Sequence, residues 1–149
     1  MKKSVGISLL LVTLPILLSA VPVQAEKDDD NGFRTPGYWK NHSGLWPTSY
    51  STSMTLETVF ASTPSELTGT TLLQALSLNG GEGAEGAQRI LARAAVAALL
   101  NAENFGSGDG AYPLSVEQVI SSVNGAFNPG HRDKMISLAE ELDSYNNLD

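Results

Sequence analysis

The clearest hydrophobic pattern in the chain covers residues 84–104. Its centre, residues 94–100 (AAVAALL), has no polar position, which predicts a helix buried on every side. Glu85 and Arg89 stand four residues apart near its start, in the order that favours an ion pair on a helix surface. The pattern therefore predicts an alanine-rich central helix that neighbouring helices can approach closely.

Two amphipathic helices are predicted after this segment. Ser115 and Gln118 have the spacing of a capping box, in which each side chain bonds to the backbone of the other residue. The apolar positions that follow at helical spacing are Val116, Val119, Ile120, Val123 and Phe127. Asn128 and Pro129 are typical of the start of a last helix. Its apolar face consists of Met135, Leu138, Ala139, Leu142 and Tyr145.

The pattern before the central helix is more interrupted. Thr35 and Pro36 predict the start of a short helix over residues 36–42, because the hydroxyl can cap free amides and proline fits the first helical position. Residues 47–60 are rich in serine and threonine and are compatible with a loop, a short helix or a strand.

A second capping-box pattern is formed by Thr63 and Glu66, and Gly69 is expected to divide the segment behind it into two shorter pieces. The leucines that follow this box are Leu67, Leu72, Leu73 and Leu76. The complete pattern predicts an all-α fold, a compact bundle of about five helices around a central alanine-rich buried helix, with no strand and no repeat.

The first 25 residues (MKKSVGISLLLVTLPILLSAVPVQA) have the pattern of a secretory signal peptide. Lys2 and Lys3 precede an apolar stretch, and residues 23–25 are typical of a cleavage site. An uncleaved membrane anchor is the alternative, because residues 5–20 approach the roughly 20 residues that span a bilayer. We expect a signal peptide over residues 1–25, a flexible acidic leader over residues 26–34 and a single helical domain over residues 35–149.

Composition and charge limit the partners of the chain. It has no cysteine, so no disulfide can stabilise it after export. With 9 basic and 16 acidic residues the formal net charge is −7, and cleavage would remove Lys2 and Lys3 and make it −9. Such a field repels phosphate backbones and anionic lipid heads. We therefore expect a secreted or periplasmic protein that binds neither nucleic acid nor, after cleavage, the membrane.

Residues 35–47 (TPGYWKNHSGLWP) contain both tryptophans of the chain, and we call them the aromatic segment. On a short helix, the rings of Tyr38 and Trp39 would flank His42, and a turn would bring Trp46 back over the first helical turn. One interpretation is structural, because an alanine-rich bundle needs the volume of two tryptophans in its core.

The other interpretation of the aromatic segment is a platform on which a sugar ring, a peptide or a cation stacks. The candidate ligand-binding residues are then Tyr38, Trp39, Lys40, Asn41, His42 and Trp46. The partner would be an extracellular polymer or a protein.

No pattern assembles a catalytic site. The chain lacks a cysteine nucleophile and a G-x-S-x-G elbow. Residues 81–86 (GEGAEG) match the dinucleotide fingerprint, but no strand precedes them and their two glutamates would repel a pyrophosphate, so we expect no cofactor. The alternative function is a metal-assisted extracellular hydrolase in which His42 and His131 bind the metal together with carboxylates.

Four stretches of the chain carry a resemblance: TPGYWKNHSGLWP, LLQALSLNGGEGAEGAQRILARAAVAALLNA, YPLSVEQVISSVN and LAEELDSYNN. Together they resemble a group of exported prokaryotic proteins and surface-protein modules that carry a Gly-Tyr-Trp-Lys-Asn-His segment. The group has no established activity, so the resemblance implies an extracytoplasmic all-α module and no catalytic residues. If it implies a shared site, the matching positions are Gly37, Tyr38, Trp39, Lys40, Asn41 and His42. We expect a small helical interaction or structural module that acts through residues 38–46, rather than an enzyme.

Overall fold

The computed structural model describes residues 32–106 and 108–148, and the prediction of an all-α fold is confirmed for them. The α-helices are α1 (Pro36–Asn41), α2 (Leu56–Val59), α3 (Leu72–Ala75), α4 (Gly83–Phe105), α5 (Val116–Phe127) and α6 (Arg132–Asn146). Two short 3₁₀ helices, η1 (Ser43–Leu45) and η2 (Ser65–Leu67), lie among them. The only β-type pairing in these ranges is one isolated bridge between Thr55 and Thr71.

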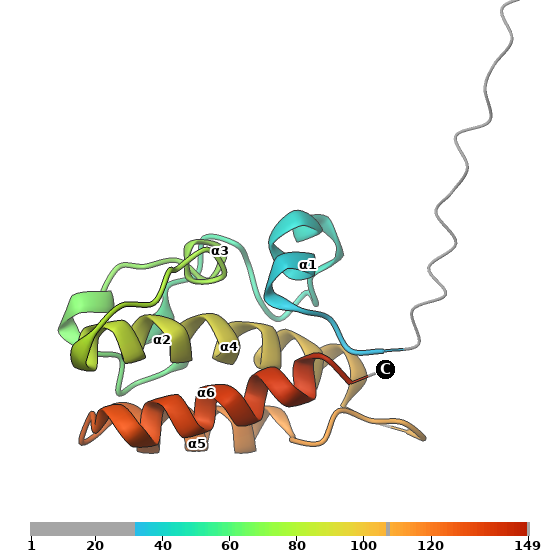
Figure 1. The fold of residues 1–149 in the computed structure, drawn as a ribbon. Helices are drawn as coiled ribbons and strands as arrows, with labels where there is room; N and C mark the ends of the chain where they lie inside the picture. The colour runs from blue at the N-terminus through green and yellow to red at the C-terminus, as the bar shows by residue number, and fades with distance from the viewer. Residues whose placement is uncertain (1–31, 107, 149) are drawn as a thin grey trace, which may run out of the picture.

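Helix α4 forms the middle layer of the molecule (Figure 1). Helices α5 and α6 lie along one side of it, and α1, α3 and their connecting loops cover the other side. This arrangement explains why residues 94–102 are all buried, since both sides of α4 are covered along this stretch. Near the start of α4 the predicted pair forms, with Arg89 Nη2 at 3.7 Å from Glu85 Oε2. The expected central helix is therefore confirmed.

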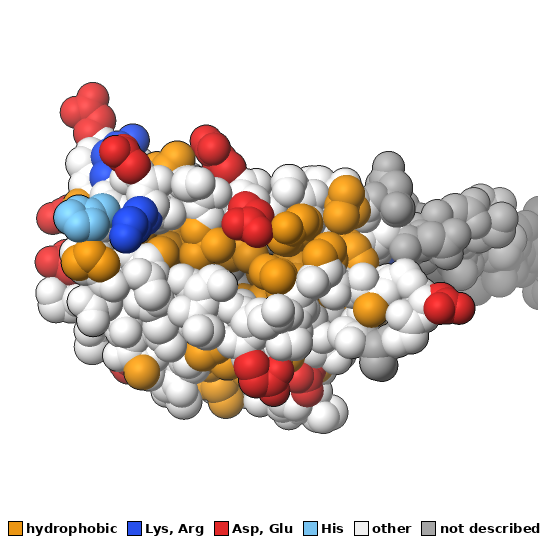
Figure 2. Space-filling model, turned by 90° about the horizontal axis from the view of Figure 1, so that it is seen from below, with side chains coloured by type: hydrophobic (Ala, Val, Ile, Leu, Met, Phe, Trp, Pro, Cys, Tyr) orange, Lys and Arg blue, Asp and Glu red, His pale blue; other side chains and the backbone are white. Residues whose placement is uncertain are grey.

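The face of the molecule opposite α1 and α3 is formed by α5 and α6, and Figure 2 shows it from below. An apolar band runs along this face between acidic side chains on either side, while basic side chains gather at one end. The band is the outer edge of the core, because the apolar side chains of α5 and α6 outside the core are only partly exposed: Val116, Ile120, Ile136, Leu138 and Tyr145.

The predicted starts of α5 and α6 can be compared with the observed ones. The capping box at Ser115 is confirmed, since its hydroxyl accepts from Gln118 N and Gln118 Oε1 accepts from Ser115 N. The start predicted at Asn128-Pro129 is wrong, because α6 begins only at Arg132. Gly130 adopts a φ of +78° in between, which interrupts a right-handed helix.

The second predicted capping box, at Thr63, is also wrong. Its hydroxyl donates backwards to Phe60 O at 2.6 Å, and only the short helix η2 follows. Gly69, with a φ of +80°, separates η2 from α3, as expected. The actual box lies eight residues later, where Thr71 and Gln74 cap the start of α3.

The fold begins earlier than the expected domain boundary at residue 35. Phe33 N donates to Leu148 O at 3.0 Å, so the two ends of the described fold are joined. Its ring also packs against Phe105 and Tyr112, with centroids 5.9 and 5.0 Å away. The expected signal peptide and most of the expected leader lie outside the described residues. None of the helices in the described ranges has the length and apolar character needed to cross a bilayer.

Candidate functional site

The aromatic segment starts with a short, well-capped helix. Thr35 Oγ1 accepts from Tyr38 N at 3.2 Å, and Pro36 occupies the first turn, where a missing N–H costs nothing. His42 ends α1 with two hydrogen bonds to one carbonyl: its backbone N–H and its ring Nδ1 both donate to Tyr38 O, at 3.0 and 2.9 Å. This fixes the proton on Nδ1 of the neutral ring.

Both tryptophans of the segment belong to the core. Trp39 is 1% exposed and Trp46 is 9% exposed. The expected turn brings Trp46 back over α1, because its Nε1 donates to Trp39 O at 2.9 Å. Trp39 Nε1 donates to Asn101 Oδ1 on α4 at 3.1 Å. Each indole N–H is therefore satisfied, and neither ring presents a face to solvent.

Asn101 is the residue through which the aromatic segment is attached to α4. It is fully buried, and all four of its hydrogen-bonding positions are used. Its Oδ1 accepts from Trp39 Nε1 and from Arg34 N, while its Nδ2 donates to Arg34 O at 2.8 Å and to Asn146 Oδ1 at 2.9 Å. The Asn101 side chain thus bonds to both the N–H and the carbonyl of Arg34, just before α1.

Asn146 extends this network to α6 and to the loop after α4. Its Oδ1 also accepts from Tyr112 Oη at 2.9 Å, and its Nδ2 donates to Ala94 O at 3.2 Å. Burial raises the pKa of the Tyr112 hydroxyl well above its usual range, so this donor keeps its proton. The aromatic segment, α4, α6 and the Tyr112 loop therefore share one buried polar network.

Tyr38 is covered by its own neighbours rather than open for stacking. The His42 ring is stacked on it with centroids 4.1 Å apart, and the Arg34 guanidinium carbon lies 4.6 Å from its centroid. Of the predicted site residues, Lys40, Asn41 and His42 are exposed, whereas Trp39 and Trp46 are not. Leu45, at the end of η1, is 59% exposed and adds an apolar side chain beside these three polar ones.

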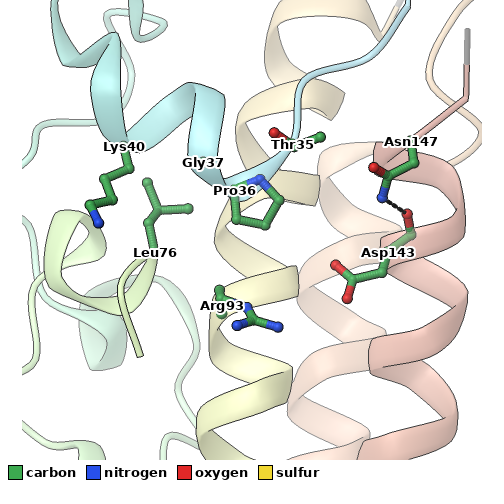
Figure 3. A pocket seen from close by; sticks show the side chains of 8 residues that line it. All are labelled: Thr35, Pro36, Gly37, Lys40, Leu76, Arg93, Asp143 and Asn147. Atoms are coloured by element: carbon green, nitrogen blue, oxygen red, sulfur yellow. Dashed lines mark hydrogen bonds between the residues drawn. The ribbon is translucent and has the colours of Figure 1, made fainter. Parts of the chain in front are cut away.

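A surface pocket of about 370 Å³ adjoins α1, and we call it the α1 pocket. Its lining comes from α1, α3, α4 and α6 and consists of Thr35, Pro36, Gly37, Lys40, Leu76, Arg93, Asp143 and Asn147 (Figure 3). Among the six candidate ligand-binding residues only Lys40 lines it, and Gly37, which the resemblance adds, also belongs to the lining. The buried network holds three of the helices that line it, since Asn101 and Asn146 join α1, α4 and α6.

The charged side chains of the α1 pocket come from three helices: Lys40, Arg93 and Asp143. Within the described residues, none of these three side chains makes a hydrogen bond or an ion pair. Burial raises the pKa of the Asp143 carboxyl, and the nearby Arg93 guanidinium only partly opposes this effect. The pocket therefore combines two cations that make no hydrogen bond or ion pair within the described residues with a partly buried carboxyl group near one of them, Arg93.

The other arginines of the described chain are all engaged. Arg34 lies over Tyr38, Arg89 pairs with Glu85, and Arg132 Nη1 donates to Gly83 O at 2.7 Å. Arg93 thus differs from them in facing a pocket, where its guanidinium lies near Asp143 but makes no hydrogen bond or ion pair with the described residues. The sequence did not single out Arg93 or Asp143, because each stands alone in an ordinary helical pattern and only the packing of α4 on α6 brings them together.

The two histidines lie at different places in the fold. His42 ends α1, whereas His131 precedes α6, which starts at the end of the molecule away from α1 (Figure 1). No group of three or more histidine, aspartate or glutamate side chains that could hold a metal ion occurs in residues 32–106 and 108–148. The geometry of the described chain gives no support to the alternative of a metal-assisted hydrolase.

No family model, curated protein or solved structure matches this chain. The resemblance to exported proteins with a Gly-Tyr-Trp-Lys-Asn-His segment therefore stays a prediction.

Proposed function

We propose that this chain is a secreted or periplasmic, non-enzymatic binding module whose ligand docks at the α1 pocket. The partner is a group on an extracellular polymer or a protein. The exposed edge of the aromatic segment, formed by Lys40, Asn41, His42 and Leu45, lies beside the pocket and would contact the rest of such a partner.

One observation carries this proposal. Lys40, Arg93 and Asp143 come from three different helices and line one pocket, and their side chains make no hydrogen bond or ion pair with the described residues. Charges on a stable surface are usually solvated singly, whereas convergence of charged groups in a hollow is typical of a site that recognises a charged ligand. The proposal keeps Lys40 from the predicted site and replaces the tryptophans by Arg93 and Asp143.

The buried half of the aromatic segment supports the proposal indirectly. Trp39 and Trp46 fix α1 against α4 through Asn101, so the position of Lys40 relative to Arg93 is set by the core. A binding site whose walls are held by buried hydrogen bonds loses little entropy when a ligand arrives. The tryptophans would thus contribute to binding by placing the pocket, without touching the ligand.

The proposal is tested with arrays of extracellular glycans, cell-wall polymers and peptides. The purified chain is expected to bind at least one class, and Lys40→Met and Arg93→Met should each weaken that binding by about tenfold, as expected for loss of a charged contact. Lys134→Met is the matched control, because this lysine lies on α6 and does not line the pocket. Binding that both pocket variants retain, or a folded chain that binds no member of the arrays, would contradict the proposal.

A further inference from the structure

We propose that the α1 pocket recognises a free acidic amino acid through its two carboxylates and its ammonium group. This inference rests on the proposed function for the location of the site and goes beyond it in naming a free small molecule as a ligand. In this assignment Arg93 binds the main-chain carboxylate, Asp143 binds the ammonium and Lys40 binds the side-chain carboxylate.

The positions of the charges carry the assignment. Figure 3 shows Arg93 and Asp143 pointing toward each other on one side of the pocket, but they do not come within ion-pairing distance in the described structure. A carboxylate and an ammonium on adjacent ligand atoms would fill this gap and pair with both. An α-amino acid provides these two groups on one carbon atom.

Lys40 determines the remaining part of the ligand. Figure 3 shows it on the other side of the pocket, with Leu76 between it and Arg93. Pro36 adds a second apolar surface to the lining. A short methylene chain would contact these apolar side chains and carry a second carboxylate to the ammonium of Lys40. This is the geometry of a dicarboxylic amino acid.

Charge balance excludes the simpler ligands. The three side chains carry one more positive than negative charge, so a ligand with two carboxylates and one ammonium neutralises all of them. A plain dicarboxylate would face the Asp143 carboxylate unpaired, and a plain cation would meet two positive groups. The pocket volume of about 370 Å³ lies at the small end of the range of about 300–1,000 Å³ that is typical of small-molecule sites.

The test is isothermal titration of the full mature chain with three probes: L-glutamate, glutarate, which lacks the ammonium, and L-2-aminobutyrate, which lacks the second carboxylate. L-glutamate is expected to bind about tenfold more tightly than either truncated probe. Equal affinity for glutarate and L-glutamate, or for L-2-aminobutyrate and L-glutamate, would overturn the assignment.

Two variants test the role of each side chain. Asp143→Asn should abolish the preference for L-glutamate over glutarate, and Lys40→Met should abolish the preference for L-glutamate over L-2-aminobutyrate. Circular dichroism and thermal unfolding confirm that each variant is folded, and Lys134→Met should keep both preferences. A variant that is folded and keeps the preference it should lose contradicts the assignment.

The outcome also separates this inference from the proposed function. If no amino-acid probe binds while an array ligand still requires Lys40 and Arg93, the pocket is a binding site but its ligand is not an acidic amino acid. If neither the probes nor any array ligand depends on these residues, both proposals are wrong.

Discussion

At the scale of single residues, the molecule depends on one buried side chain, Asn101. It satisfies the indole of Trp39, the backbone of Arg34 and the amide of Asn146, each of which is far from Asn101 in the sequence. A buried polar group in a helix of alanines and leucines is costly unless it is fully bonded, and here it is. The sequence showed this asparagine at the end of the apolar run, but no local pattern identified its partners 45 to 67 residues away.

Replacement of Asn101 tests this network. Asn101→Ala should lower the free energy of unfolding by about 3 kcal/mol, because it leaves the Trp39 N–H and the Asn146 carbonyl without one of their buried partners. Urea unfolding followed by circular dichroism measures the loss. Asn104→Ala is the matched control, since Asn104 is exposed on the same helix. A change of similar size in the control would show that the effect comes from the helix and not from the network.

Asp143 gives a prediction about pH. Because burial raises the pKa of its carboxyl in the folded chain above the unfolded value, the folded chain binds the proton more tightly. Stability is therefore lost as the pH rises through the window between the unfolded pKa, about 4, and the raised folded pKa. Asp143→Asn should be more stable than the parent chain at neutral pH, and this advantage should shrink as the pH falls through that window and be lost below about pH 4.

The measurement is urea unfolding of both chains across this pH range. Glu140→Gln, an acid-to-amide change at an exposed position of the same helix, is the control and should alter the free energy of unfolding by less than about 0.5 kcal/mol. An Asp143→Asn chain that is less stable than its parent at neutral pH would show that the carboxylate is stabilised in the fold, contrary to the account.

At the scale of the elements, the sequence predicted the long helices well and their ends less well. α4 and α5 were found because periodicity and a capping box are local signals. The failures at Thr63 and at Asn128-Pro129 have one cause: the same residues are equally suited to turns, and glycines with positive φ at 69 and 130 decide between turn and helix. The α1 pocket was missed because it depends on how helices pack and not on any one of them.

Alanine substitutions at two glycines, one in α4 and one in α5, test how these helices are packed. At Gly86 in α4, a Cβ would collide with the carbonyl of Gly81, whereas at Gly125 in α5 it would meet no atom within 4 Å. Gly86→Ala should therefore destabilise the fold by about 2 kcal/mol or more. Gly125→Ala should stabilise it by about 0.5–1 kcal/mol, because alanine is the better helix former.

Thermal unfolding of the two variants beside the parent chain measures these opposite shifts. A neutral Gly86→Ala would mean that the loop at Gly81 does not lie against the start of α4 as described, and the packing of this end would need revision.

At the scale of the whole molecule, the two tryptophans of the aromatic segment are part of the core, and the proposed ligand-binding surface lies beside them. The sequence offered the structural interpretation of the tryptophans as one of two, because an alanine-rich helix leaves volume that only large side chains fill, and their burial confirms it. The location of the pocket did not follow, since it requires α1, α3, α4 and α6 to meet. The proposed binding site therefore depends on how Trp39 and Trp46 attach α1 to the core.

The most direct test of this account is tryptophan emission with acrylamide quenching on residues 26–149. Trp39 and Trp46 are the only tryptophans, so both signals report on the aromatic segment. The account predicts blue-shifted emission that acrylamide quenches poorly until the chain unfolds, and stronger protection still in Trp46→Phe, where only the more buried Trp39 remains. Red-shifted emission that acrylamide quenches readily in the folded chain would contradict it, because the tryptophans would then face solvent and the segment itself would be the binding surface.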